Sequence, residues 1–505
     1  MADSVTPMQL GSNRQLLFDP VFLADSRGVE LRMNAPYQDP EPVLTPDRPW
    51  EVGRFGRYHT VMLEDGRFRM WYAVTTEADG RRRDLLCYAE SEDGLHWEKP
   101  ALGIVPFRGS SENNIVAPPS PEAGQQGATV FRDDRGPADE RYKLWTKYLA
   151  SDEDRKRGIE TGLWAMVSPD GLHWRLLQEE GYPLTRGNAA DAQHTCFWDE
   201  DIGKYVGFVR VKKFPEGKTK EVCHVRGFRL KKYDGLLQRT CWVGHLTSDD
   251  FRSWTMAEKV FAADERDETA PVPGGAPGWR PLVDYYVPGG MKVPGVAGAY
   301  ILLPNAYYHW RDDAFPSTLD VRLATSRDMV SWYQHPAREP FLRLGADGSA
   351  SAGMILANPW LIPVGDELWL YYAGVGVDHR ALSQGEPVPC GIFRARLRRD
   401  GFISADAPYD GGEFTTPVVT FSGSRLELNL DGSAGGWLQV EILTPEGTPE
   451  AGYELAACDP LRSNSTGRIV TWGGKQNVSA LAGRPLRLRF VMRSMKLFAF
   501  QFVPS

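Results

Sequence analysis

A short fragment that recurs at a nearly constant interval constrains the fold of this chain more than any other feature. Each copy has a Ser, an Asp two positions later and a Trp four positions after the Asp. The copies end at Trp97, Trp174, Trp254 and Trp332, so consecutive copies are 77, 80 and 78 residues apart. A fixed period of this kind is the signature of a repeat architecture, in which each repeat packs mainly against its neighbours.

Every copy is preceded by short segments rich in aromatic and β-branched residues. The segments 67–74, 142–148, 204–210 and 299–304 are bounded by Gly, Asp or Pro, which is typical of β-strands. A further strand is expected directly before the motif, as at 85–89 and 321–324. Each period therefore predicts several antiparallel strands and no amphipathic helix. Repeated four-stranded units are the blades of a β-propeller.

A fifth, degenerate unit follows the four clear copies. Segment 366–374 matches the aromatic strand, segment 390–397 matches the strand before the motif, and residues 399–401 (Arg-Asp-Gly) stand where the motif is expected. These units predict a five-bladed β-propeller over residues 51–410. We interpret the recurring turn as structural, because Ser and Asp bond nearby backbone, Gly permits positive φ, and Trp packs between neighbouring sheets.

The sequence on either side of the repeats has no period. Residues 1–50 are predicted to be a lead-in that packs on the propeller. After about residue 413, the segments 425–430, 437–442 and 486–492 alternate strictly between apolar and polar residues, which is typical of half-buried strands. We therefore predict an all-β chain: a five-bladed β-propeller followed by a C-terminal antiparallel β-sandwich over residues 413–505.

Composition argues against several classes of function. The net charge of −8 leaves no basic surplus for a nucleic-acid partner, and no run approaches the ~20 apolar residues of a membrane span. The first ten residues lack a basic start and an apolar stretch, and the six Cys are scattered without metal-ligand spacing. These features predict a cytoplasmic protein without a metal or cofactor, although a secreted protein with its leader removed would look the same.

The combination of blades and sandwich resembles the five-bladed-propeller glycoside hydrolases, a superfamily that contains invertases, fructanases, arabinanases and mannoside phosphorylases. The resemblance covers nearly all of residues 51–505 and rests on the blade-turn motif and the architecture. It implies a glycoside hydrolase, exo-acting on a small oligosaccharide or glycoside, with furanosides such as fructosides or arabinosides favoured. The Trp-x-Asn-Asp-Pro-Asn segment of invertases, an Arg-Asp-Pro motif and a Glu-Cys motif are absent, so no catalytic residue is transferred from the family.

Candidate catalytic residues come from the expected first strand of each blade, where side chains converge on the propeller axis. Glycoside cleavage needs two carboxyl groups on opposite sides of the scissile bond. Asp191, Asp284 and Glu51 are the acids on these expected strands. Asp191 is the first choice, although it could instead cap a turn. Asp284 could simply begin a strand, and Glu51 could pair with Arg54.

Polar and aromatic residues on the same strands are candidate substrate-binding groups. They could bind sugar hydroxyls or stack on a sugar ring, and each could equally be a hydrogen-bonded or packed residue of the propeller interior. The candidates are Arg57, His59, Asn114, Gln193, His194, Tyr285 and Trp360.

Three functions remain open from the sequence. The first is hydrolysis of a carbohydrate substrate by a carboxylate pair in the axial pocket. The second is a non-catalytic carbohydrate-binding propeller, which the missing family motifs favour. The third is a glycoside phosphorylase, which needs basic residues to hold phosphate, with Arg54 and Arg57 as candidates. The sequence predicts neither the oligomeric state nor the identity of the sugar.

Overall fold

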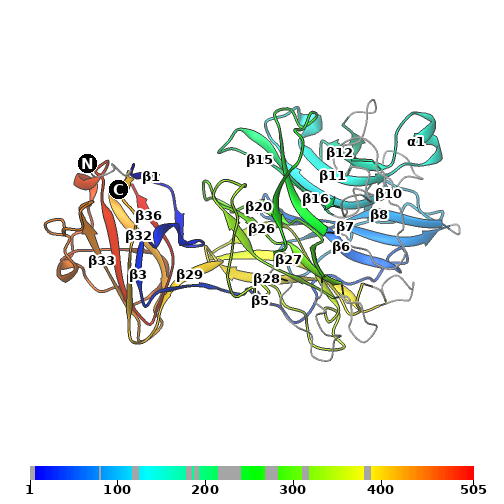
Figure 1. Ribbon diagram of the computed structural model, residues 1–505. Helices are drawn as coiled ribbons and strands as arrows, with labels where there is room; N and C mark the ends of the chain where they lie inside the picture. Colours follow the sequence, from blue (N-terminus) through cyan, green and yellow to red (C-terminus); the bar gives the residue numbers. More distant parts are fainter. Residues whose placement is uncertain are drawn as a thin grey trace.

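The structure is a computed structural model of the 505-residue chain. It describes residues 6–78, 81–116, 124–177, 185–186, 193–213, 240–264, 266–267, 282–309, 318–379, 381 and 388–504. This part is almost entirely β-structure; its single α-helix, α1 (Asp152–Lys156), has five residues. No helix among the described residues is long and apolar enough to cross a membrane. Figure 1 shows two lobes, and both chain ends lie in the smaller one.

The larger lobe, here called the repeat lobe, holds five sheets in its described part. The first consists of β6 (Arg54–Glu64), β7 (Arg67–Ala78), β8 (Arg81–Ser91) and β9 (Ile115–Val116). The second consists of β10 (Gly124–Arg132), β11 (Tyr142–Leu149), β12 (Gly162–Ser168) and β13 (Arg175–Leu176), with β14 (Thr185–Arg186) also on β12. The third consists of β15 (Thr195–Asp199), β16 (Lys204–Lys213), β17 (Thr240–Ser248) and β18 (Glu258–Ala262).

The strands that follow the third sheet in the sequence are divided between the other two sheets. The fourth consists of β20 (Gly290–Lys292), β21 (Tyr300–Leu302), β24 (Ala324–Ser326) and β25 (Tyr333–Gln334). The fifth consists of β26 (Met354–Val364), β27 (Glu367–Val375), β28 (Cys390–Arg398) and β5 (Tyr37–Gln38). It is extended beside β26 by β23 (Leu319–Val321), β22 (Asn305–His309) and β19 (Leu282–Tyr285), with β23 parallel to β26.

The first strands of these five sheets contact one another in a closed order. β6 contacts β10, β10 contacts β15, β15 contacts β20, β20 contacts β26, and β26 returns to β6. The spaces between adjacent sheets are filled by separate apolar clusters, each built from two neighbouring sheets. Aromatic side chains such as Trp71 and Trp145 are fully buried in them. Because the sheets are stabilised by packing face to face, the ends of their strands remain available to form a site.

The recurring turn has the same hydrogen bonds in all four copies. The Ser hydroxyl donates to the Asp carboxylate and accepts from the main-chain N–H groups two and three residues on. The Asp carboxylate accepts from the main-chain N–H groups two and three residues after the Asp. The fourth residue has positive φ every time: Gly94 (73°), Gly171 (79°), Phe251 (64°) and Met329 (63°). The structural interpretation of the motif is confirmed.

The smaller lobe, here called the terminal lobe, contains two larger sheets and a strand pair. One sheet consists of β3 (Asp25–Arg27), β30 (Gly412–Thr415), β35 (Arg487–Arg493) and β33 (Trp437–Leu443). The other consists of β34 (Asn464–Ile469), β32 (Arg425–Asp431), β36 (Met495–Val503), β29 (Ile403–Ala407) and β4 (Glu30–Met33), with β2 (Gln15–Leu16) on β36. β1 (Met8–Gly11) pairs in parallel with β31 (Val419–Phe421). One apolar core joins them, and the alternating Leu426, Leu428 and Leu430 are all buried in it.

The lead-in differs from the expectation that residues 1–50 pack on the propeller. Strands β1 to β4, within residues 8–33, pair with strands of the terminal lobe instead. β5 and the bridge between Leu44 and Ile392 do lie against the repeat lobe. Residues 403–407, expected in the last blade, also belong to the terminal lobe. The unpaired backbone groups of a strand need a partner along each edge, but the side-chain pattern does not say which sheet provides that partner.

The degenerate fifth turn is where the lobes join. The guanidinium of Arg398 donates to the side-chain oxygens of Asn429 at 2.8 Å and Asn464 at 2.6 Å. Asn429 in turn donates to the Asp400 carboxylate at 2.9 Å. Asp400 has φ of 65°, like the fourth residue of the other turns. This turn contacts the terminal lobe, which gives a physical reason for the loss of the Ser and Trp found in the other four copies.

Candidate active site

The candidate site lies where the first strands of the sheets begin. Three of these strands break register near their start, between Phe55 and His59 in β6, between Gln126 and Thr129 in β10, and between Ala357 and Leu361 in β26. An irregularity of this kind bends the strand and changes the direction of its side chains, and such bulges are frequent next to active sites. In β6 the irregular segment contains Gly56, whose φ of 62° is readily adopted by glycine.

His59 lies at the centre of the first group of contacts. Its Nδ1 is 2.9 Å from the main-chain oxygen of Gly56 and 3.1 Å from the side-chain nitrogen of Asn358 in β26. The Gly56 oxygen can only accept and the Asn358 amide nitrogen can only donate, so these two contacts favour opposite tautomers of the ring. Burial lowers the pKa of His59 to about 4. The ring is therefore neutral at ordinary pH, and its buried Nε2 has no hydrogen-bond partner among the described residues.

Gln193 and His194 connect this group to the third sheet. The Gln193 side-chain amide donates to the main-chain oxygen of His59 at 3.0 Å and to that of Ala128 at 2.8 Å. His194 Nδ1 accepts from the main-chain N–H of Arg210 at 3.2 Å. Both Gln193 and His194 are buried. The structure thus brings three predicted binding residues, His59, Gln193 and His194, into one set of contacts.

The contacts continue from Arg210 through a group of aromatic rings. The Arg210 guanidinium is 4.5 Å from the ring centroid of Tyr286. Tyr286 is 5.8 Å from Tyr307, and His379 is 5.7 Å from Tyr286 and 5.1 Å from Tyr307. Rings of this kind, beside a cation, offer both flat faces and polar edges to a ligand. The chain of contacts therefore runs from β6 through β16 and β22 to the end of β27.

Asp284 is the predicted acid whose strand pairs with a strand of this chain of contacts. It pairs directly with Tyr307 across β19 and β22, so the two side chains share a face. Its carboxylate accepts from the main-chain N–H of Cys241 at 2.7 Å, and it is 1% exposed. Asn305, the first residue of β22, is also buried; its amide donates to the Ile355 oxygen at 3.0 Å.

We call these residues the inner polar group. Its members are His59, Gln193, His194, Arg210, Asp284, Tyr286, Asn305, Tyr307, Asn358 and His379. Besides His59 Nε2, the side-chain oxygens of Gln193 and Asn305 are buried and have no hydrogen-bond partner among the described residues. Buried polar atoms nearly always have partners. Three such atoms within one group of contacts mark it as the candidate functional site.

The other predicted residues lie elsewhere or join other contacts. Asp191 lies outside the described residues. Glu51 accepts from Tyr72 at 2.6 Å and from Lys99 at 2.7 Å, and its second oxygen also accepts from two main-chain N–H groups. Asn114 donates to the same Tyr72 hydroxyl. Tyr285 is fully buried and bonds Asp267 and Gln334. Arg57 is nearly buried beside the ring of Tyr58.

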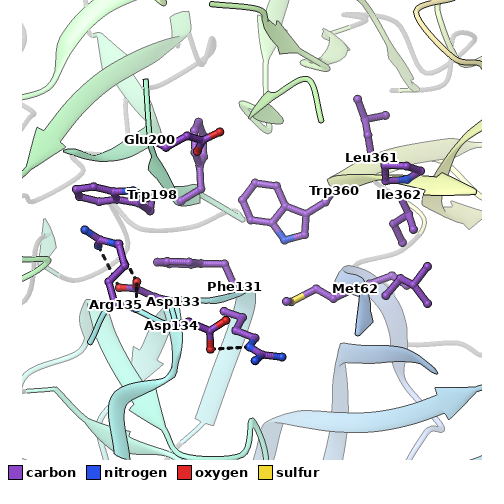
Figure 2. Close-up of a pocket in the computed structure, with 15 residues that line it drawn as sticks. Met62, Phe131, Asp133, Asp134, Arg135, Trp198, Glu200, Trp360, Leu361 and Ile362 are labelled. Carbon is purple, nitrogen blue, oxygen red and sulfur yellow. Dashed lines mark hydrogen bonds and ion pairs between the residues drawn. The ribbon is translucent and has the colours of Figure 1, made fainter. Parts of the chain in front are cut away.

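Trp360 lines a cavity at the opposite ends of the first strands (Figure 2). This cavity of about 570 Å³ is bounded by the ends of β6, β10, β15 and β26. Trp360 donates to the Val130 oxygen at 2.9 Å, and Phe131 and Met62 form neighbouring walls. Trp360 therefore does not join the inner polar group, whose residues lie at or near the starts of these strands.

Charged groups around this cavity are paired with one another. Burial of Asp133 opposes its ionisation, but hydrogen bonds from Tyr205 and Lys143 hold its pKa below the ordinary value. Arg135 bonds Asp133 and stacks on Trp198, as Figure 2 shows. Glu200 pairs with Lys292 at 2.7 Å. The described carboxylates that line this cavity, Asp133, Asp134 and Glu200, therefore each pair with a cation of the protein itself.

Sequence reasoning missed several members of the inner polar group. Arg210 ends the aromatic segment of the third repeat, and Tyr307 and His379 lie outside the expected first strands. No sequence signal singles out Arg210, because its strand also contains Lys204, Lys212 and Lys213. Among the described residues, no three His, Cys, Asp or Glu side chains are placed to hold a metal ion.

Comparison with known proteins gives weak likenesses. No family model matches the chain. Two curated relatives, the "Uncharacterized protein MT1551" and the "Uncharacterized protein Rv1502" of Mycobacterium tuberculosis strains CDC 1551 / Oshkosh and ATCC 25618 / H37Rv, are each 27% identical over 152 residues. The match covers 29% of this chain and 40% of each relative, so the chain spans less than half of their length.

Three solved structures illustrate the structural likeness. An N-acetylgalactosamine deacetylase from F. plautii, in complex with blood group B trisaccharide, has 15% identity and a TM-score of 0.44 over 74% of this chain and 96% of its own. A glycosyl hydrolase from Bacteroides ovatus has 14% sequence identity and a TM-score of 0.40, over 79% of this chain and 96% of its own. The α-L-arabinofuranosidase of Podospora anserina, in complex with cellotriose, has 11% sequence identity and a TM-score of 0.39, over 72% of this chain and 98% of its own. These values assign neither a family nor an activity.

Proposed function

We propose that this protein is a carbohydrate-active enzyme, a glycoside hydrolase acting on a small oligosaccharide or glycoside. The observation that carries the proposal is the continuous series of contacts from His59 through Arg210 to His379 at the starts of the first strands. In this proposal the repeat lobe is a five-bladed propeller, supported by the closed order of contacts among β6, β10, β15, β20 and β26. The terminal lobe is its β-sandwich.

The inner polar group would hold the sugar through hydroxyl contacts and ring stacking. His59 Nε2 and the Gln193 and Asn305 side-chain oxygens are buried and have no described partners. In this proposal, substrate entry opens the group and sugar hydroxyls become their hydrogen-bond partners. Tyr286 and Tyr307 offer ring faces, and Arg210 offers a donor. A site built to satisfy hydroxyls discriminates strongly against ligands that lack them, because its acceptors would stay unpaired.

Cleavage would use two carboxyl groups, with one protonating the leaving oxygen and the other acting on the opposite side of the sugar. Asp284 supplies one in this proposal, because it shares a face with Tyr307. Asp191 is proposed as the second, from its position two residues before Gln193 in the sequence. Glu51 is a third candidate from the sequence. Its four described hydrogen bonds favour a role in positioning instead.

The test is turnover on a panel of chromogenic glycosides and natural oligosaccharides, with and without inorganic phosphate. Asp284→Asn and Asp191→Asn should each lower kcat by roughly 10²–10⁴-fold while the protein stays folded. Asp154→Asn is the matched control, because Asp154 is equally buried but caps α1 in the second sheet. It should lower stability without changing turnover per folded molecule. Ordinary turnover in both site variants would exclude this carboxylate pair.

A non-catalytic carbohydrate-binding protein is the second candidate function. The observation that favours it is the engagement of Glu51 and Asp284 in hydrogen bonds to the protein itself. In that case the wild-type protein binds sugars without turning them over, and Arg210→Ala weakens binding. Turnover that requires phosphate would instead identify a phosphorylase, with Arg210 as a cation near the site.

A further inference from the structure

The terminal lobe has a second hollowed surface, which is separate from the inner polar group. A cavity of about 630 Å³ lies at one end of the sheet formed by β3, β30, β35 and β33. Figure 1 shows β3 and β33 in the smaller lobe, with both chain ends. The lining residues that could contact a ligand are Arg27, Tyr409, Asp410, Glu413, Trp437 and Arg493.

Two aromatic rings and one guanidinium group dominate this cavity. Trp437 begins β33 and pairs directly with Arg493 in β35, so their side chains lie side by side on one face of the sheet. The Arg493 guanidinium is 4.0 Å from the ring centroid of Tyr409. Tyr409 is 69% exposed, whereas Trp437 is half-buried. An exposed tyrosine beside a half-buried tryptophan gives the cavity aromatic walls that remain open to solvent.

The polar groups of the cavity carry no excess of one charge. Arg489 bridges Glu413 at 2.6 Å and Glu441 at 2.9 Å, which holds Glu413 in place at the edge of the cavity. Arg27 and Arg493 are balanced by Asp410 and Glu413. The Nε atom of Arg493 is buried and has no hydrogen-bond partner within the described part of the chain. This balance argues against a phosphate or a polyanion and favours a neutral ligand with many hydroxyl groups.

We propose that this cavity binds a neutral carbohydrate chain, as a second site distinct from the proposed active site. A sugar ring has an apolar C–H face that packs on Trp or Tyr, and hydroxyl edges that exchange hydrogen bonds with guanidinium and carboxylate groups. The cavity volume lies within the ~300–1,000 Å³ typical of small-ligand sites. The choice of carbohydrate rests in part on the proposed function. The binding measurement below does not depend on turnover.

The test measures binding by the full chain directly. Native gels containing levan, arabinan, mannan or xylan should retard the wild-type protein in at least one case, and calorimetry with that polysaccharide gives the affinity. Trp437→Ala and Tyr409→Ala should each weaken this affinity at least tenfold. Turnover of a small chromogenic glycoside, if the wild type has it, should stay unchanged. Tyr409 is so exposed that its variant should fold even if Trp437→Ala does not.

Tyr37→Ala is the matched control. Tyr37 is 58% exposed and has the Arg396 guanidinium 4.8 Å from its ring centroid, so it repeats the Tyr–Arg pair of the cavity on the repeat lobe. It should bind like the wild type. The proposal is overturned if no polysaccharide retards the wild type, if Tyr409→Ala binds unchanged, or if Tyr37→Ala loses as much affinity. Loss of turnover in Asp284→Asn with this binding intact would separate the two sites.

Discussion

The hydroxyl of Tyr371 donates a 2.8 Å hydrogen bond to the main-chain oxygen of Gly94, 277 positions earlier in the chain. Tyr371 lies in β27 of the fifth sheet, and Gly94 lies in the turn after β8 of the first. Trp71 makes the equivalent 2.6 Å bond to Gly171 in the second sheet. These two turns are thus each held by an aromatic residue of the preceding sheet, and the Tyr371–Gly94 bond joins the last repeat to the first.

Gly94→Ala should be strongly destabilising because of this contact. A Cβ atom at residue 94 would lie 2.5 Å from the Tyr371 hydroxyl and 2.9 Å from the Trp369 ring. Gly66→Ala is the control, since Gly66 also has positive φ (81°) but nothing within 4 Å of that position. The control should lose about 1 kcal/mol for its backbone conformation. Gly94→Ala should lose about 2 kcal/mol more from overpacking. Equal losses by chemical denaturation would contradict the close approach.

The ion pair of Glu51 and Lys99 should contribute to stability as a coupled unit. The two side chains are 0% and 3% exposed, and their charged atoms are 2.7 Å apart. Removing one partner leaves the other charge buried, which typically costs about 3–5 kcal/mol. Glu51→Gln and Lys99→Met should each lower the unfolding free energy by this amount, and the double variant should lose less than the sum. Additive losses in the double-mutant cycle would show that the pair is not coupled.

The same Glu51→Gln variant separates a positioning role from a catalytic one. If the hydrogen bonds to Tyr72 and Lys99 define its role, turnover per folded molecule should stay within a few-fold of the wild type. A loss of kcat of roughly 10²-fold or more in folded protein would instead support Glu51 as a member of the carboxylate pair.

His59 should make stability depend on pH in a defined window. Burial lowers its pKa from 6.5 to about 4 in the folded protein, so the unfolded chain binds the proton more readily. Its contribution is present above pH 6.5 and is lost as pH falls from 6.5 towards 4, because the protonated ring is disfavoured in the fold. The loss should approach about 3 kcal/mol at about 1.4 kcal/mol per pH unit. In His59→Gln, this part of the pH slope should disappear. An unchanged slope in denaturant titrations between pH 7 and 4 would contradict the assignment.

Cutting the chain after residue 412 should cost solubility. The sequence predicts that residues 1–50 pack on the propeller, but β2, β3 and β4 lie in sheets whose other strands include β36, β30 and β29. The cut removes β31, β32 and β36 and leaves unpaired strand edges and apolar faces. Expression of 1–412 should give mainly aggregated protein. Soluble, monomeric 1–412 with the stability of the full chain would show that the lobes fold independently.

The sequence by itself determined the repeat and its turns. The spacing of Ser, Asp and Trp predicts local hydrogen bonds within a few residues, and such short-range geometry depends little on the rest of the fold. The alternation of Leu426, Leu428 and Leu430 likewise predicts a half-buried strand, because side chains alternate with a period of two. His59, Gln193 and His194 were predicted from the expected first strands, which are placed by counting back from the aromatic strand of each repeat, and the structure brings them into one set of contacts.

The tertiary structure decided which strands are partners and which side chains meet. β1 to β4 join the terminal lobe because their edges pair with strands more than 300 residues away, and no local pattern encodes that choice. Arg210 and His379 join the inner polar group from strands whose sequence gives no axial signal. Trp360 lines the other cavity because the strand irregularity before it sets its direction. The residue type fixes the chemistry of each side chain, whereas the long-range pairing of strands fixes which other residues it contacts.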